Sequence, residues 1–200
     1  VIVYHMFAVQ ERYFGVNLLP EAFKHGGWGV DIFFVISGVV MFKSVFGRAT
    51  AAAPWPFLRA RISRIYPPYW VITFVIFGIY LVAPSMVNSS YETQPSVLRS
   101  LLLLPDVTTP WLNVGWSLVY EMWFYLLLTA LLLLPGRAAI AALGAYGVFL
   151  LLAPALTQFG PVLALVSDAL ILEFLIGFAI GAVFFQAPAP RKTPALLAVA

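Results

Sequence analysis

The stretch GGWGVDIFFVISGVVMF, from Gly26 to Phe42, is made almost entirely of apolar and small residues, yet it carries an aspartate at position 31. Such composition is typical of a membrane-spanning helix, which needs roughly 20 mostly apolar residues. The whole 200-residue chain follows this pattern, since 62% of its residues are hydrophobic, 10% are charged and the mean hydropathy is +0.97. Because about a quarter of the residues in a soluble domain are charged, the composition predicts a membrane protein.

We predict an all-α fold, a polytopic bundle of transmembrane helices. Apolar blocks of spanning length predict helices at residues 1–10 (partial), 28–46, 66–87, 116–134, 138–157, 169–186 and from 193 onward (partial). The segment 96–115, SVLRSLLLLPDVTTPWLNVG, is too short and too interrupted to span. We expect it at the membrane interface, or dipping into the membrane and back. Because the first and last blocks are incomplete, we expect residues 1–200 to be one membrane-embedded domain that is truncated at both ends.

The basic residues of the short loops predict the orientation of the chain. One side carries eight of them: Lys43, Arg48, Arg59, Arg61, Arg64, Arg137, Arg191 and Lys192. The other side carries three: Arg12, Lys24 and Arg99. Because cytoplasmic loops are enriched in Lys and Arg, the first side should face the cytoplasm. We therefore predict a multi-pass protein of the cell's inner (plasma) membrane.

Four ionisable side chains fall inside the predicted spans: His5, Asp31, Glu121 and Glu173. Counted at 1.5 Å per residue, each lies about 7–12 Å below the outer surface. An ionisable group at this depth costs a few kcal/mol or more unless it faces protein or a water-filled cavity. The four groups should therefore converge on one polar layer near the outer face.

Each of these residues also has a simpler structural explanation. A lone intramembrane histidine such as His5 often forms a hydrogen bond between helices. Asp31 is close enough to the start of its helix to interact with the positive end of the helix dipole. For Glu173 we favour a structural pairing with a neighbour. On the functional interpretation, Asp31 shares a face with Phe34 and Gly38 that points toward the first helix and His5.

The segment PWPFLRARISRIYPPYW, residues 54–70, holds two arginines three residues apart, Arg61 and Arg64. The pattern predicts a short interfacial helix on the cytoplasmic side that ends at Pro67–Pro68. The arginines could be topology anchors that reach toward lipid phosphates. They could equally form a clamp for a phosphorylated ligand, because guanidinium groups bind phosphate bidentately. The residues alone favour the anchor.

The opening stretch strongly resembles the signature G-x-G-V-D-x-F-F-V-x-S-G of the acyltransferase-3 family of membrane O-acyltransferases. Three further segments resemble family elements in the same order. VIVYH, residues 1–5, is similar to the end of the family's first helix, RARISRIYPPYW to its R-x-x-R-x-x-P segment, and GWSLVYEMWFYL to its W-S-L-x-x-E-x-x-F-Y element. The family core has about ten spans, so the resemblance implies that the chain is a fragment.

The resemblance implies transfer of an acyl group, usually acetyl, from cytoplasmic acetyl-CoA to a hydroxyl of an extracytoplasmic glycan or glycolipid. It implies His5 as the essential histidine, Arg61 and Arg64 as donor-binding residues, and Glu121 and Asp31 as active-site acids. The expected partners are the lipid bilayer and a carbohydrate acceptor, with no metal and no nucleic acid.

These residues suit the implied chemistry. Burial disfavours the imidazolium form, so a neutral His5 could take the proton from a sugar hydroxyl as that hydroxyl attacks the thioester. The small residues Ser37 and Gly38 should leave room for the arm of the donor along the second helix. The alternative function is a proton-coupled transporter or flippase, which would also use buried acids, a histidine and broken helices. Binding of acetyl-CoA distinguishes the two.

Overall fold

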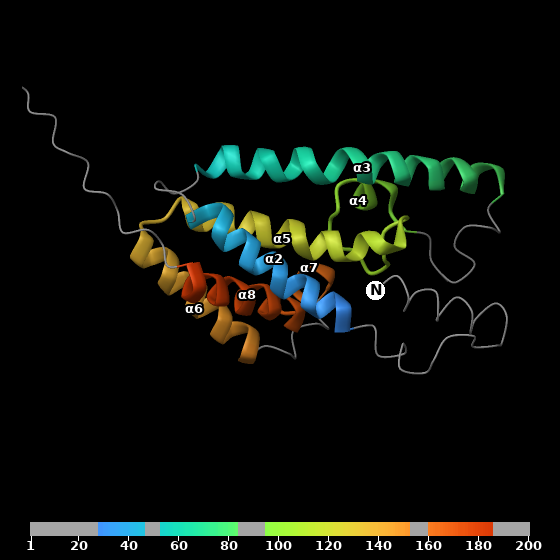
Figure 1. Cartoon of the computed structure of the whole chain (residues 1–200). Coiled ribbons are helices and arrows are strands. Elements are labelled where there is room, and N and C mark those ends of the chain that lie inside the picture. Colours follow the sequence, from blue (N-terminus) through green and yellow to red (C-terminus); the bar gives the residue numbers. More distant parts are fainter. Residues whose placement is uncertain (1–27, 47–52, 84–94, 153–159, 186–200) are drawn as a thin grey trace, which may run out of the picture.

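The computed structural model describes residues 28–46, 53–83, 95–152 and 160–185, and this part of the chain contains helices and no strands. The predicted helical bundle is therefore confirmed. His5 lies outside the described residues, as do the two partial spans at the ends. The elements, drawn in Figure 1, are α2 (Trp28–Phe46), α3 (Pro54–Val82), α4 (Val97–Leu101), η3 (Asn113–Gly115), α5 (Trp116–Leu132), α6 (Gly136–Leu152), α7 (Pro161–Val166) and α8 (Ala169–Phe185).

Within the described residues, four helical stretches are long and apolar enough to cross a membrane: Trp28–Phe46, Pro54–Val82, Asn113–Leu131 and Pro161–Phe185. Helix α6 is apolar but shorter. Many large apolar side chains lie on the outside of the bundle, for example Val71, Phe74 and Val75 of α3. Such a surface is stable against lipid rather than water. The predicted spans at 28–46, 116–134, 138–157 and 169–186 are confirmed as helices that begin within two residues of the predicted positions.

Helix α3 corrects one prediction, because it runs without a break through Pro67 and Pro68 as a single helix of 29 residues. The sequence had predicted a short interfacial helix that ends there. Each proline removes one backbone hydrogen bond and strains the helix. Ending the helix inside a bilayer would instead leave several backbone groups with neither water nor protein partners, which costs more. As a result, Arg61 and Arg64 belong to the same helix as the apolar span that follows them.

Helices α2 and α8 pack backbone to backbone. A Cβ atom added at Gly177 would lie 1.9 Å from the carbonyl oxygen of Val35, and one added at Gly38 would lie 2.2 Å from that of Phe174. The rings of Phe34 and Phe174 are 4.6 Å apart beside this contact. The face of α2 that was expected to point toward the first helix therefore packs against α8. Small residues on both helices allow this packing, as they commonly do between membrane helices. The first helix lies outside the described residues, so the approach of Asp31 to His5 stays a prediction.

Helix α4 lies against the middle of α3 (Figure 1), and aromatic side chains hold it there. Three side chains of α3 donate hydrogen bonds of 2.7–2.8 Å to its last carbonyls: Tyr66 to Leu102, Tyr69 to Ser100 and Trp70 to Leu101. The last carbonyls of a helix have no partner within the helix. The aromatic donors therefore supply the partners that a bilayer cannot. They explain how the segment 96–115 lies beside a spanning helix without spanning itself.

The α2–α8 contact predicts a sharp difference between two glycine-to-alanine changes. Gly177→Ala should lower the free energy of unfolding by about 1–3 kcal/mol, because its methyl group overlaps the α2 backbone. Gly144→Ala on α6 adds the same methyl group where no atom lies within 4 Å. The second change should be neutral or stabilise by up to about 1 kcal/mol, because alanine is the better helix former. Thermal unfolding of both variants in detergent measures the difference, and equal effects would contradict the close contact.

Candidate functional site

A cavity of about 520 Å³ lies between α2, α3 and α5. We call it the α2–α3–α5 cavity. Its polar lining groups are Ser37 of α2, Arg64 and Tyr69 of α3, and Glu121 and Tyr125 of α5, and the remaining lining is apolar. Helix α2 packs on α8 and helix α3 packs on α5. The space between these two pairs of helices is therefore what forms the cavity.

The cavity is elongated and has a charged end and an apolar end. Along the chain it extends from Val114, just before α5, to Tyr125, which corresponds to about 16 Å of helix. Arg64, Glu121 and Tyr125 lie at one end, and Leu112, Val114 and Ile72 lie toward the other. A ligand with a charged head and a long, mostly apolar arm matches this distribution.

Glu121 is fixed at the charged end by its own helix and by α3. Tyr125, four residues later on the same face of α5, donates a hydrogen bond to the Glu121 carboxylate. Arg64 and Arg61 both lie close enough to interact electrostatically with this carboxylate. The structure thus brings together three of the residues predicted for the site, on two different helices.

Arg61 is enclosed by protein next to the charged end. Its guanidinium donates a hydrogen bond to the hydroxyl of Ser44 and lies over the rings of Phe57 and Tyr125, at 5.4 and 5.6 Å from their centroids. Its Nε is buried and has no hydrogen-bond partner among the described residues. An anchor that reaches for lipid phosphates extends to the surface, whereas Arg61 is held within the bundle. A buried guanidinium N–H without an acceptor is suited to an anionic ligand.

The predicted single layer of acids is divided in the structure. Asp31, in the first turn of α2, lies close enough to Glu173 of α8 to interact with it electrostatically. One carboxylate oxygen of Glu173 is buried and has no hydrogen-bond partner among the described residues. The pairing with a neighbour that was expected for Glu173 is therefore not formed at this oxygen. Asp31 is not among the residues that line the α2–α3–α5 cavity, whereas Glu121 is.

Two consecutive residues of α2 decide where a ligand has room. Ser37 lines the cavity, but Gly38 is filled from the other side by the backbone of α8. The expectation that both residues leave room for a donor holds only for Ser37. Adjacent residues on a helix point about 100° apart, so one residue faces the ligand space and the next faces the packing contact.

Sequence reasoning missed the roles of Tyr125 and Ser44. The signal for Tyr125 was present, because it follows Glu121 by four residues and so shares its face of the helix. No sequence signal indicated Ser44. It is 17 residues from Arg61 along the chain and meets it only through packing of α2 beside α3.

Comparison with known proteins agrees with these observations. Residues 1–200 match the model of the acyltransferase-3 family, which is described as an acyltransferase domain. The Exopolysaccharide production protein ExoZ of Rhizobium meliloti (strain 1021) is 31% identical over an alignment of 177 residues, which covers 84% of this chain and 54% of that protein. The chain thus spans about half the length of this relative, and no solved structure matches it. With a match along its whole length and with apolar helices of spanning length, the chain belongs to the acyltransferase-3 family of membrane acyltransferases.

Proposed function

We propose that the protein is an O-acyltransferase of the cell's inner membrane. It moves an acyl group, in our proposal acetyl, from cytoplasmic acyl-CoA to a hydroxyl of an extracytoplasmic glycan or glycolipid. The observation that carries the proposal is the α2–α3–α5 cavity, which has Arg64 and Glu121 at one end, Arg61 beside them and an apolar remainder. Family membership supports acyl transfer. The printed name of the relative, an exopolysaccharide production protein, supports a glycan as the acceptor.

The charged end of the cavity fits the phosphates of coenzyme A. Arginine presents a planar fork of donors that matches phosphate geometry. Arg61 has a buried Nε that finds no hydrogen-bond partner in the described part of the chain, and Arg64 lines the cavity. We assign Glu121 the role of orienting the two guanidinium groups, because its carboxylate lies near both of them and is itself held by Tyr125. The apolar part of the cavity would take the arm and acyl group of the donor.

The reaction needs a base at the acceptor hydroxyl, and we assign this role to His5. The hydroxyl oxygen attacks the thioester carbonyl carbon while the imidazole takes the hydroxyl proton. The carbon–sulfur bond then breaks, the ester remains on the glycan, and the thiol of coenzyme A leaves with a proton returned to its sulfur. Asp31 is the acid that we assign to the imidazolium, because a carboxylate stabilises that cation and orients the ring. We do not assign this role to Glu121, because its carboxylate already interacts with Arg61 and Arg64.

The alternative of a proton-coupled transporter or flippase keeps the buried acids and His5 as support, but α3 is not a broken helix. A carrier would move its substrate unmodified and would not need a phosphate clamp beside a long apolar cavity. The decisive experiment is mass spectrometry of cell-surface glycans from cells with and without the gene, combined with acetyl-CoA binding to the purified protein. An added acetyl group that depends on the gene supports the transferase, and transport without modification supports the carrier.

The two arginines should bind the donor. Arg61→Ala combined with Arg64→Ala should weaken acetyl-CoA binding about 10²–10⁴-fold, because each removes charge-assisted hydrogen bonds worth about 1.5–3 kcal/mol. The corresponding lysine changes should restore binding only in part, since the fork geometry is lost. Arg59→Ala, on the same helix but outside the cavity lining, is the control and should bind normally. Normal acetyl-CoA binding by the double variant, with altered membrane topology, would show that the arginines are anchors.

The assigned base should be essential. His5→Ala should reduce acyl transfer by about 10²–10⁴-fold, the range that a general base contributes, while membrane insertion and acetyl-CoA binding persist. The other histidine of the chain offers a matched control, and His25→Ala should leave transfer unchanged. Transfer of radiolabelled acetyl groups in membranes measures both variants. A well-expressed His5→Ala variant with normal transfer would contradict the assignment.

Asp31 should act through its charge. Asp31→Asn keeps the size and the ability to accept a hydrogen bond but removes the negative charge, so it should lower acyl transfer about tenfold or more without changing the unfolding temperature. Glu173→Gln, the same change on the neighbouring acid, should affect transfer less. If Asp31→Asn retained full transfer, then Asp31 would serve only the start of its own helix.

A further inference from the structure

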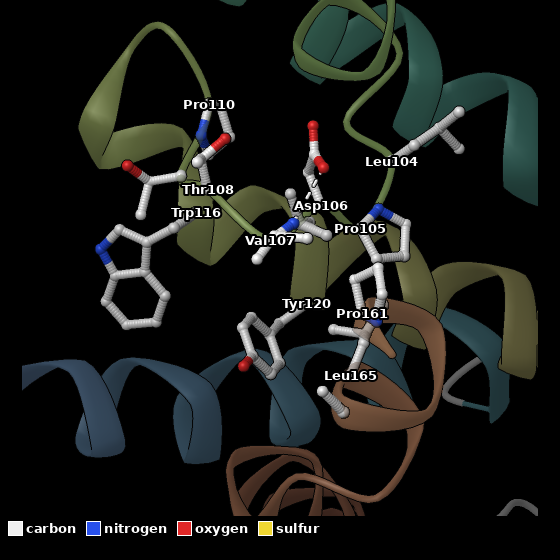
Figure 2. A pocket seen from close by; sticks show the side chains of 13 residues that line it. Leu104, Pro105, Asp106, Val107, Thr108, Pro110, Trp116, Tyr120, Pro161 and Leu165 are labelled. Carbon is white, nitrogen blue, oxygen red and sulfur yellow. Dashed lines mark hydrogen bonds between the residues drawn. The ribbon is translucent and has the colours of Figure 1, made fainter. Parts of the chain in front are cut away.

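A second, smaller pocket lies at the start of α5, on the other side of this helix from the α2–α3–α5 cavity. It has a volume of about 250 Å³, and we call it the Trp116 pocket. The segment 104–110 forms one wall, Trp116, Val119 and Tyr120 of α5 form another, and the beginning of α7 closes it (Figure 2). The walls of this pocket come from three separate segments of the chain, so no local pattern of residues predicts it.

Polar contacts and prolines fix the wall formed by segment 104–110. One oxygen of the Asp106 carboxylate accepts hydrogen bonds from Arg99, at 3.1 Å, and from the backbone N–H of Val107, at 2.8 Å. Pro105 and Pro110 restrict the backbone on either side. A wall that is already ordered loses little entropy when a ligand binds.

The opposite wall presents two aromatic rings. Trp116 and Tyr120 are four residues apart on α5, with ring centroids 6.0 Å apart and planes at 87°. In Figure 2, Trp116 lies at one edge of the pocket and Tyr120 lies nearer its middle. The Tyr120 hydroxyl donates a 2.7 Å hydrogen bond to Asp168, which holds the ring in place. The indole of Trp116 is only partly buried, so part of its surface is open to a ligand.

The linings of the two spaces alternate along the chain around η3 and α5. Pro110 and Trp116 line the Trp116 pocket, whereas Leu112 and Val114, between them in sequence, line the apolar end of the larger cavity. Within α5, Tyr120 faces the pocket and Glu121 faces the cavity. A ligand in the pocket would therefore lie next to the end of the cavity that is remote from the arginines.

We propose that the Trp116 pocket binds one sugar ring of the acceptor. This inference rests on the proposed function and names the place where the glycan is held. The apolar face of a sugar ring packs well against an indole, and sugar hydroxyls donate to carboxylates and exchange hydrogen bonds with threonine hydroxyls. Asp106 and Thr108 supply these groups. The pocket is smaller than the roughly 300–1,000 Å³ of sites for drug-sized ligands, which suits a single ring.

The charge of the pocket makes it a poor binding site for the acyl donor. Asp106 lines it and Asp168 lies behind Tyr120, so its acidic groups disfavour the phosphates of coenzyme A. The arginine end of the larger cavity has the opposite preference. The pocket should accordingly select an uncharged, hydroxyl-rich ring over an anionic one.

The test uses oligosaccharides cut from the surface polysaccharide of the strain that carries the gene, with ester groups first removed by mild alkali. Trp116→Leu removes the aromatic face and keeps an apolar side chain. It should raise the KM for these oligosaccharides about tenfold, the effect of losing roughly 1.4 kcal/mol of ring contact, and leave the KM for acetyl-CoA within twofold. Thr108→Val should do the same to a smaller extent. Trp55→Leu is a matched change at an exposed tryptophan of α3 and should alter neither constant.

Different results of this test would overturn the inference and the proposed function. If the unchanged protein transfers acetyl groups to these oligosaccharides, but Trp116→Leu and Thr108→Val leave both KM values unchanged, the pocket is not the acceptor site and the inference is overturned. An equal rise in the KM for acetyl-CoA would also overturn it, because the effect would then not be specific to the acceptor. If the unchanged protein neither binds acetyl-CoA nor transfers acetyl groups, the proposed function itself fails.

Discussion

Inside a bilayer, a backbone carbonyl or a guanidinium finds no water, and each group left without a partner costs several kcal/mol. This constraint governs the structure. Helix α3 continues through Pro67 and Pro68 rather than stopping. The last carbonyls of α4 accept hydrogen bonds from aromatic side chains of α3. One terminal nitrogen of the Arg61 guanidinium donates to the hydroxyl of Ser44, and the group lies over two aromatic rings, although its Nε has no hydrogen-bond partner among the described residues. Each arrangement supplies from the protein what lipid cannot.

The contact between α2 and α8 determines the shape of the larger cavity. With no bulk hydrophobic effect between helices in lipid, association depends on close van der Waals packing. Gly38 and Gly177 allow that packing by bringing the two backbones together. One side of α2 is thereby closed, and Ser37 on the next face is left to line the cavity toward α3 and α5. The cavity thus depends on a packing contact made by the neighbouring face of α2.

Helix α5 connects the two candidate ligand sites. Its Glu121 and Tyr125 face the α2–α3–α5 cavity, and its Trp116 and Tyr120 face the smaller pocket. In an acyl transfer between a cytoplasmic donor and an extracytoplasmic acceptor, the two substrates approach from opposite sides of the membrane. One helix that lines a space for each can position both. Its own placement is fixed by α3 on one side and by α6 and α8 on the other.

The sequence by itself determined the membrane environment and most of the helix positions within the described residues, because hydropathy is a local property. The residues that it indicated for the chemistry stay predictions. The four-residue spacing of Glu121 and Tyr125 also puts them on one face of a helix, but their hydrogen bond was recognised only in the structure. Only the tertiary structure decided that Glu121 meets the arginines while Asp31 meets Glu173. Hydropathy does not fix the rotation of a helix about its axis in lipid. That rotation is set by which surfaces pack most closely, and here the glycines of α2 and α8 set it.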